Sequence, residues 1–335
     1  MKFGLYNAIL HDRPLADAIK VIADQGLTGL ELNTGGFLPP KHIPNIDEIL
    51  ESDTARDDFL GIFEGTGVSL AGLNCNGNPL HPNALIGGVH GEDVKRSIRL
   101  ANRLGQNRVV TMSGSPGGEP GAKYPNWIVN AWNSAHLDVL EYQWSVAVDY
   151  WSEVDKLARD NDVKVALELH PQNLVFNPAS MRELIERAKT TNIGVELDAS
   201  HLFWQHMDPI AVVKNLGDIV VHAAAKDVRI NPHAEIEGVL DNSFRRLRED
   251  ENRTSLGEGE WVNEWPNPSA WDFVALGRGH DVDYWAGFIK ALYEVDPNMI
   301  LNIEHEDVSL GRVEGIEVAA KVLLEAARKA GVENK

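Results

Sequence analysis

The sequence predicts an α/β protein that folds as one closed (β/α)8 TIM barrel over residues 1–335. Short apolar runs alternate with stretches of helical period along the whole chain. Eight of these runs are each followed by a helical stretch, which favours a closed barrel over an open sheet. A content of 43% hydrophobic residues is ample for a sizeable core. The predicted strands are residues 2–7, 27–33, 68–74, 108–113, 163–170, 193–201, 219–227 and 299–306.

Helical periodicity separates these strands, and the longest helix is expected after the last one, at residues 314–331. Two connections are much longer than usual, at residues 114–136 after the fourth strand and 228–280 after the seventh. We call these the first and second insertions. Both follow strands, so both are expected at the carboxyl end of the barrel, where active sites of this fold lie. The other predicted helices include residues 14–26, 93–105, 180–190 and 284–295.

The insertions also contain five of the nine tryptophans, including Trp127. These tryptophans either anchor the long loops to the barrel, or form an aromatic pocket wall or a partner-docking surface.

Composition excludes several classes of function. The net charge is −19 and no basic run is present, which argues against binding to nucleic acid or to a membrane surface. Cys75 is the single cysteine, so an internal disulfide is excluded and a reducing compartment is expected. No segment approaches the roughly 18 consecutive apolar residues of a membrane span, and the first residues do not resemble a secretory signal. We therefore expect a cytoplasmic protein.

Polar side chains end several of the predicted strands. In residues 163–170 the alternation of faces places Glu168 and His170 on one side, opposite an apolar side. The same parity turns Asp198, Lys226 and Glu304 toward the barrel mouth. Any one of these carboxylates could simply pair with Lys226. Three together would raise one another's pKa unless a cation balanced them, which indicates a metal site.

Oxygen-rich ligation with one imidazole suits a single divalent ion, for which Mn²⁺ is the first choice and Mg²⁺, Co²⁺ or Zn²⁺ are alternatives. Further polar residues are expected around this ion. Glu306 shares the parity of the ligands, and Asn33 and Asn74 end the second and third strands, where they could bond a polyol or cap loops. Trp127 and Arg278, from the two insertions, are also expected to contact substrate.

The strand endings "ELH", "DASHLFWQ", "HAAAKD" and "IEHED" resemble those of the sugar phosphate isomerase/epimerase family, the xylose-isomerase-like TIM barrels. The resemblance covers essentially the whole chain and implies that Glu168, Asp198 and Glu304 ligate the metal. The family's histidine ligand falls on Ala224, which cannot ligate. We therefore expect His280, in the second insertion, to replace it, with His222 as the alternative.

A second departure concerns His170, which stands where keto-sugar 3-epimerases of this family have an asparagine. The α subunits of C-glycoside deglycosidases carry a histidine at this position. This resemblance implies a metal-dependent lyase that removes a proton next to the carbonyl of a 3-oxo-glycoside and eliminates the aglycone. His170 is then the general base, His201 holds substrate hydroxyls or is a second acid/base, and Lys226 steadies an oxyanion.

Two other functions stay open. The chain could be a keto-sugar isomerase or epimerase acting on free sugars, or a non-catalytic carbohydrate-binding barrel subunit. The endonuclease IV branch of the same fold is disfavoured by the acidic surface. The substrate is expected to be a small carbohydrate or glycoside. The protein is expected to form a homo- or hetero-oligomer, with a smaller β subunit as one candidate partner.

Overall fold

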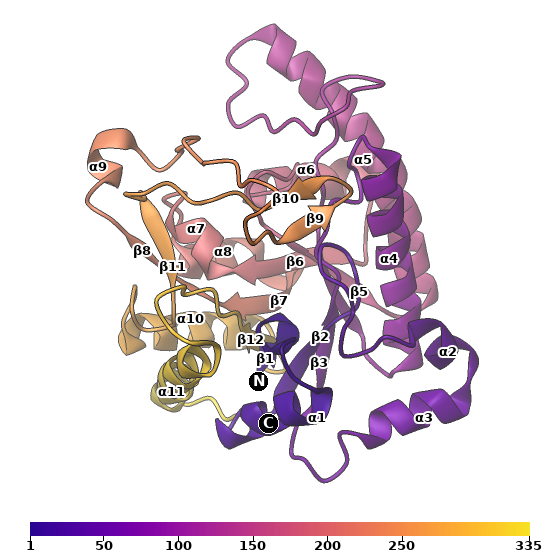
Figure 1. Cartoon of the computed structure of the whole chain (residues 1–335), viewed down its shortest axis with the longest axis vertical. Helices are drawn as coiled ribbons and strands as arrows, with labels where there is room; N and C mark the ends of the chain where they lie inside the picture. Colours follow the sequence, from indigo (N-terminus) through magenta and orange to yellow (C-terminus); the bar gives the residue numbers. More distant parts are fainter.

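A computed structural model describes residues 1–335 of the chain. Eight parallel strands close into a barrel in the order β1-β12-β7-β6-β5-β4-β3-β2, surrounded by helices (Figure 1). All eight predicted strands are present, so the predicted fold is confirmed. The barrel strands are β1 (Lys2–Tyr6), β2 (Gly29–Asn33), β3 (Ser69–Asn74), β4 (Arg108–Met112), β5 (Lys164–Glu168), β6 (Ile193–Asp198), β7 (Val220–Ala225) and β12 (Ile300–Ile303).

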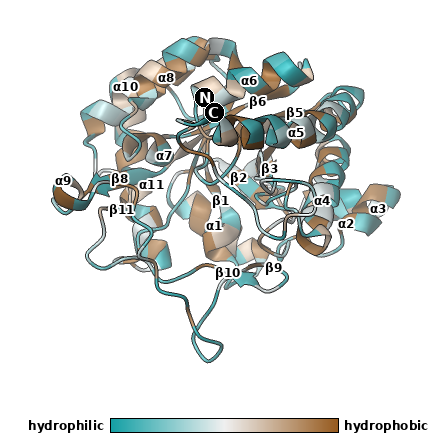
Figure 2. Ribbon diagram, turned by 90° about the horizontal axis from the view of Figure 1, so that it is seen from above, coloured by the Kyte–Doolittle hydropathy of each residue, from teal (hydrophilic) through white to brown (hydrophobic).

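The helices pack around the barrel, and many have a hydrophobic and a hydrophilic side (Figure 2). The longest helix is α5, with 27 residues, and not the last helix α11, which has 19, so that prediction was wrong. None of the helices combines the length and apolarity needed to cross a bilayer. The α-helices are α1 (Leu15–Asp24), α2 (Ile46–Glu51), α3 (Asp53–Gly61), α4 (Ala84–Arg103), α5 (Ser134–Asp160), α6 (Pro178–Ala188), α7 (Ala199–Phe203), α8 (Pro209–Leu216), α9 (Ala234–Glu237), α10 (Val282–Val295) and α11 (Arg312–Ala330). Short 3-10 helices are η1 (Asn7–Leu10) and η2 (Gly217–Ile219).

Six barrel strands end earlier than the sequence predicts, and two of these endings shape the site. β6 stops at Asp198 because this residue is the N-cap of α7, where its side chain accepts a hydrogen bond from the backbone N–H of Ser200 at 2.8 Å. His201 therefore lies on a helix and not on a strand. β12 stops at Ile303, so Glu304 follows the strand directly. Both endings bring polar side chains to the carboxyl end of the barrel.

The second insertion, residues 228–280, folds into small sheets of its own. Its two ends pair as β8 (Asp227–Ile230) and β11 (Trp271–Val274), and its middle forms a hairpin of β9 (Ser255–Gly257) and β10 (Glu260–Trp261). The insertion leaves the barrel after β7, which lies opposite β3 in the closed strand order.

The hairpin of the second insertion reaches the β3 side of the barrel. His81, in the connection from β3 to α4, has its Nε2 3.0 Å from Oε1 of Glu260. Gly257 packs closely on α4, since a Cβ added to it would lie 3.2 Å from Cγ1 of Ile86. The second insertion therefore crosses the barrel mouth from β7 to β3, as its orange ribbon shows in Figure 1.

Tryptophans attach the second insertion to the barrel. Trp204, just after α7, stacks on Trp271 of β11 with ring centroids 4.9 Å apart and planes 6° from parallel. These two rings belong to a small buried cluster beside the main core of 67 buried residues. In the first insertion, Trp127 packs against Phe176 whereas Trp132 is 89% exposed. Trp271 therefore anchors its insertion to the barrel, in agreement with one of the two expectations. Trp132 does not anchor the first insertion, since it lies on the surface.

Candidate metal centre

Three carboxylates meet at the carboxyl end of the barrel. Glu168 ends β5, Asp198 ends β6 and Glu304 follows β12, and one oxygen of each lies within 4.8 Å of the others. Their side chains are 2%, 1% and 8% exposed, so little water reaches them. The alternation of faces along the strands therefore predicted correctly that these three side chains lie together at the barrel mouth.

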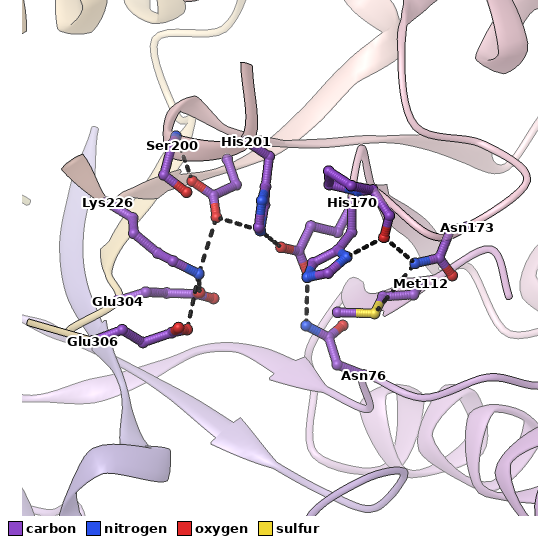
Figure 3. A network of polar contacts seen from close by, with 12 residues as sticks. Asn76, Met112, His170, Asn173, Ser200, His201, Lys226, Glu304 and Glu306 are labelled. Carbon is purple, nitrogen blue, oxygen red and sulfur yellow. Dashed lines mark hydrogen bonds and ion pairs between the residues drawn. The ribbon is translucent and has the colours of Figure 1, made fainter. Parts of the chain in front are cut away.

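Lys226 is the cation that the structure places among these carboxylates (Figure 3). Its Nζ lies 3.3 Å from Oδ2 of Asp198, 3.3 Å from Oε2 of Glu304 and 2.8 Å from Oε1 of Glu306. One ammonium cannot neutralise these acids together with Glu168. The site therefore keeps an excess of negative charge, which a divalent ion would balance.

His201 supplies the imidazole nearest to this group. Its Nε2 lies 3.2 Å from Oε1 of Glu168 and 3.4 Å from Oδ2 of Asp198. Neither contact has the orientation of a hydrogen bond, and both ring nitrogens of His201 and Oδ2 of Asp198 are buried without a hydrogen-bond partner. The ion pair of Lys226 with Asp198 is likewise close but not aligned as a hydrogen bond, so Oδ2 of Asp198 stays unsatisfied.

Buried donor atoms that lack hydrogen-bond partners are suited to ligate a cation. Donor atoms that face one another at about 3–4 Å without hydrogen bonds are suited to share an ion between them. A second group of donor atoms, from Glu168, His170 and His201, also lies within 4.8 Å and shares Glu168 with the first. The mixture of carboxylate oxygens and imidazole nitrogen suits Mn²⁺ and Zn²⁺ among the divalent ions.

His170 lies beside His201, with ring centroids 4.1 Å apart. Its Nδ1 is 2.6 Å from the backbone carbonyl oxygen of Pro171. A carbonyl only accepts hydrogen bonds, so Nδ1 carries the proton of the neutral ring and Nε2 keeps its lone pair. His170 is thus arranged as a base whose Nε2 is available to a substrate.

Burial sets the protonation states of the site. It raises the pKa of Glu304 well above its usual value and also raises that of Glu168. Burial lowers the pKa of His170 and of His201 to about 4, which keeps both rings neutral at pH 7. Burial opposes ionisation of Asp198, but the ammonium of Lys226, the His201 ring and the hydrogen bonds from Ser200 together outweigh it, so the pKa of Asp198 lies below its usual value.

The two histidines expected to complete the ligand set lie elsewhere. Nδ1 of His280 is 2.7 Å from Oδ1 of Asp227, and its ring stacks on Phe203 at 3.7 Å, outside both groups of donor atoms. His222 is fully buried, with Nε2 2.8 Å from Oε2 of Glu31. His201 takes the expected place because α7 begins directly after its N-cap Asp198. The first turn of the helix brings His201, three residues after Asp198, back toward the carboxylates.

The expected substrate-binding residues are dispersed. Asn74 is fully buried and both ends of its amide are hydrogen-bonded. Asn33 donates to the carbonyl oxygen of Gly35 at 3.1 Å, and its own Oδ1 is buried without a partner. Glu306, with a half-exposed side chain, borders the centre through Lys226.

Trp127 and Arg278 lie away from the donor atoms. Trp127 lines a cavity of about 300 Å³ with residues of α5 and α6. Arg278 pairs with Asp307 and donates a hydrogen bond to Ser309 at 2.8 Å. Neither residue belongs to a group of candidate metal donors.

Two residues at the centre escaped prediction. Phe273 of β11 covers the site, with its ring 4.5 Å from Nζ of Lys226 and 5.6 Å from the ring of His201. No sequence pattern marks it, because it comes from the second insertion. Glu31 lies on the inner face of β2, in the sequence "GLELN". Glu31 shares the inward face of Asn33 in a buried strand, and this pattern could have indicated a polar residue inside the barrel.

Comparison with known proteins places the fold in a family. The family model described as xylose isomerase-like TIM barrel matches residues 19–326. Protein YfiH of Bacillus subtilis (strain 168), itself described as uncharacterized, is 34% identical over 328 residues. The match covers 96% of this chain and 98% of YfiH. The predicted family is thereby confirmed.

Solved structures share the fold at lower identity. The probable 3-DHS dehydratase AsbF from Bacillus anthracis, involved in petrobactin synthesis, is 17% identical with a TM-score of 0.63, covering 97% of this chain and 99% of AsbF. The IOLI protein, solved with a binding zinc atom, is 19% identical with a TM-score of 0.62, covering 98% and 99%. An L-ribulose 3-epimerase is 14% identical with a TM-score of 0.59, covering 99% and 97%. The expectation of an enzyme agrees with this family and these relatives.

Proposed function

Since the chain belongs to the xylose isomerase-like TIM barrel family, we propose that it is a metal-dependent enzyme acting on a carbohydrate next to a carbonyl group. More narrowly, we propose a lyase that resembles the α subunit of C-glycoside deglycosidases and eliminates the aglycone of a 3-oxo-glycoside. The observation that carries this proposal is the placement of His170. Its Nε2 is free, and its ring lies against the carboxylate cluster two residues after Glu168.

Glu168, Asp198 and Glu304 would hold the divalent ion, with Nε2 of His201 as the nearest nitrogen. When bound, such an ion polarises the substrate carbonyl and makes the neighbouring C–H bond more acidic. Mn²⁺ is the proposed native ion. The zinc in the IOLI structure supports a divalent ion in this fold without selecting manganese.

The proton steps follow from the side chains. Nε2 of His170 takes the proton from the carbon next to the carbonyl, and the C–H electron pair forms a carbon–carbon double bond. The bond from the neighbouring carbon to the aglycone breaks, and the aglycone leaves with that electron pair. His170, protonated in the first step, returns that proton to the leaving group. The ammonium of Lys226, whose pKa lies well above its usual value because of the carboxylates around it, steadies the developing oxyanion.

A keto-sugar isomerase or epimerase is the second candidate. The proximity of His201 to His170, with rings 4.1 Å apart, provides a second imidazole that could return the proton to the substrate without loss of an aglycone. The L-ribulose 3-epimerase among the solved structures supports this alternative at the level of the fold. Both candidate reactions begin with removal of the proton next to the carbonyl. In the lyase the electron pair then expels the aglycone, and in the isomerase or epimerase it takes up a proton again.

Metal analysis combined with a substrate screen tests the proposal. We expect one divalent ion per chain, lost in Glu304→Ala and retained in Glu141→Ala, which removes an exposed carboxylate of α5 that pairs with Arg187. Aromatic 3-oxo-glycosides and free keto-sugars are then compared with and without chelator. Release of the aglycone supports the lyase, and turnover of free sugars alone supports the isomerase. A metal-free protein without turnover of either class would leave a carbohydrate-binding subunit.

We also propose that the protein works as an oligomer, with a copy of itself or with a smaller subunit. The first insertion and the start of α5 expose apolar side chains, with Trp132 89% and Leu137 56% exposed. Tryptophan is enriched among the residues that contribute most of the binding energy at protein interfaces. Sedimentation of the wild-type protein and of Trp132→Ser, alone and with candidate partners, measures this directly. The cytoplasmic location stays a prediction from the sequence.

A further inference from the structure

A second polar group lies inside the barrel around Glu31 of β2. Its carboxylate accepts hydrogen bonds from Asn74 of β3 at 2.8 Å and from Asn302 of β12 at 2.6 Å. Nε2 of His222 on β7 is 2.8 Å from the same carboxylate. All four side chains are at most 2% exposed. Four barrel strands therefore share one buried carboxylate that is not a candidate metal ligand.

A chain of hydrogen bonds joins Glu31 to the candidate metal centre. Oδ1 of Asn74 accepts a hydrogen bond from the backbone N–H of Asn76 at 3.0 Å. Nδ2 of Asn76 donates to Oε2 of Glu168 at 2.7 Å. Glu168 is thus held at Oε2, and its Oε1 faces His201 and the other donor atoms.

The direction of each hydrogen bond in this chain is fixed. The backbone N–H of Asn76 can only donate, so the side-chain oxygen of Asn74 must face it and the Asn74 amide nitrogen must face Glu31. Glu31 must then accept from both sides, which only an ionised carboxylate does well. Burial raises the pKa of Glu31, but His222 and the two amide donors outweigh it, and the pKa lies below its usual value.

We infer that Glu31 is a positioning residue for the metal centre, acting through Asn74 and Asn76 on the carboxylate of Glu168. The inference rests on the proposed metal-binding function. It assigns a role to an inner barrel residue that touches neither the metal donors nor the substrate. Outer hydrogen bonds of this kind orient ligands and typically change metal affinity by about 10- to 100-fold.

The isosteric change Glu31→Gln tests this role by metal titration against a chelator, without any measurement of turnover. Glutamine offers one acceptor and one donor, so it cannot accept from both Asn74 and His222. We expect the affinity for Mn²⁺ to fall by about 10- to 100-fold. The double variant Glu31→Gln/Asn74→Asp should restore affinity. Its new carboxylate can accept from the new glutamine amide with one oxygen and from the N–H of Asn76 with the other.

Controls separate this role from general loss of stability. Asp155→Asn removes a buried carboxylate of α5 that accepts backbone hydrogen bonds from Thr191 and Asn192, and it should bind Mn²⁺ like the wild type. If Glu31→Gln does not fold, Asn76→Ala tests the last link of the chain, since it removes the hydrogen bond to Glu168 from a partly exposed position. Unchanged Mn²⁺ affinity in this variant would also overturn the inference.

Unchanged affinity in Glu31→Gln, or weakened affinity that Asn74→Asp does not restore, would overturn the inference. A wild-type protein that binds no divalent ion would instead contradict the metal centre itself.

Discussion

His170 is the residue on which the proposed chemistry depends. We expect His170→Gln to keep the bound metal and to lower kcat by about 10²- to 10⁴-fold, because glutamine fills similar space but cannot take a proton. Turnover at saturating Mn²⁺ is the measurement, with metal content determined on the same sample. His280→Gln is the matched control, since Asp227 holds that ring outside both groups of donor atoms.

The alternative role of His170 is ligation, because it belongs to a second donor group with Glu168 and His201. A His170→Gln protein that loses its metal, and regains a near wild-type rate when Mn²⁺ is supplied in excess, would show ligation and not base catalysis.

Residue-level prediction worked where side chains sit on regular strands. Period-two alternation placed Glu168 and Asp198 at the mouth, because both end strands that run straight into it. It failed for His201, which follows a change from strand to helix that the alternation does not describe. It also failed for His280, because the path of a 53-residue insertion, numbered 228–280, decides where that ring lies.

At the scale of elements, we expect the second insertion to control access to the site. It crosses the mouth and is held on the far side by the contact of His81 with Glu260 and by the packing of Gly257. Phe273, near its base, lies against Lys226 and His201. We therefore predict that substrate entry requires the hairpin of β9 and β10 to move.

Cross-linking tests this requirement. We expect the double variant His81→Cys/Glu260→Cys, bridged by a short reducible bis-maleimide, to lose turnover and to release its metal to a chelator more slowly. Reduction of the linker should restore both rates. The natural Cys75 should stay unmodified, because it is fully buried and burial raises the pKa of its thiol to about 12.

The two single-cysteine variants treated with the same reagent are the controls for this experiment. Full turnover in the bridged protein would mean that substrate enters by another route, and the hairpin would then be only a fixed cover.

The regular elements were predictable because barrel strands and their covering helices each carry a local periodicity. β9 and β10 were not, because their position depends on contacts between residues about 180 positions apart, such as His81 and Glu260. No pattern in the neighbouring sequence indicates that these two residues pair. The start of α5 at Ser134 differs, because the cap of Asn133 that sets it is a local signal inside the predicted loop and could have been used.

For the whole molecule, we expect the metal to stabilise the fold. The buried carboxylates repel one another when the ion is removed, so the native state should be less stable without it. At free Mn²⁺ of about 100 times Kd, the gain in unfolding free energy is about 2.7 kcal/mol. Thermal denaturation of the chelator-treated protein, before and after addition of Mn²⁺, measures the gain.

Glu304→Ala should show no such rise in Tm, whereas Glu141→Ala should behave like the wild type. An identical Tm with and without Mn²⁺ in the wild-type protein would argue against a structural contribution of the ion.

The clustering of tryptophans has an optical consequence. Trp261, Trp265 and Trp271 all lie in the second insertion, and the ring of Trp261 sits 3.7 Å from the guanidinium carbon of Arg253. Indole emission depends on nearby charge and on contact with water, so displacement of the hairpin would change the colour and intensity of the protein's own fluorescence. We therefore expect the tryptophan fluorescence to report movement of the hairpin, readable in a stopped-flow instrument without any attached dye.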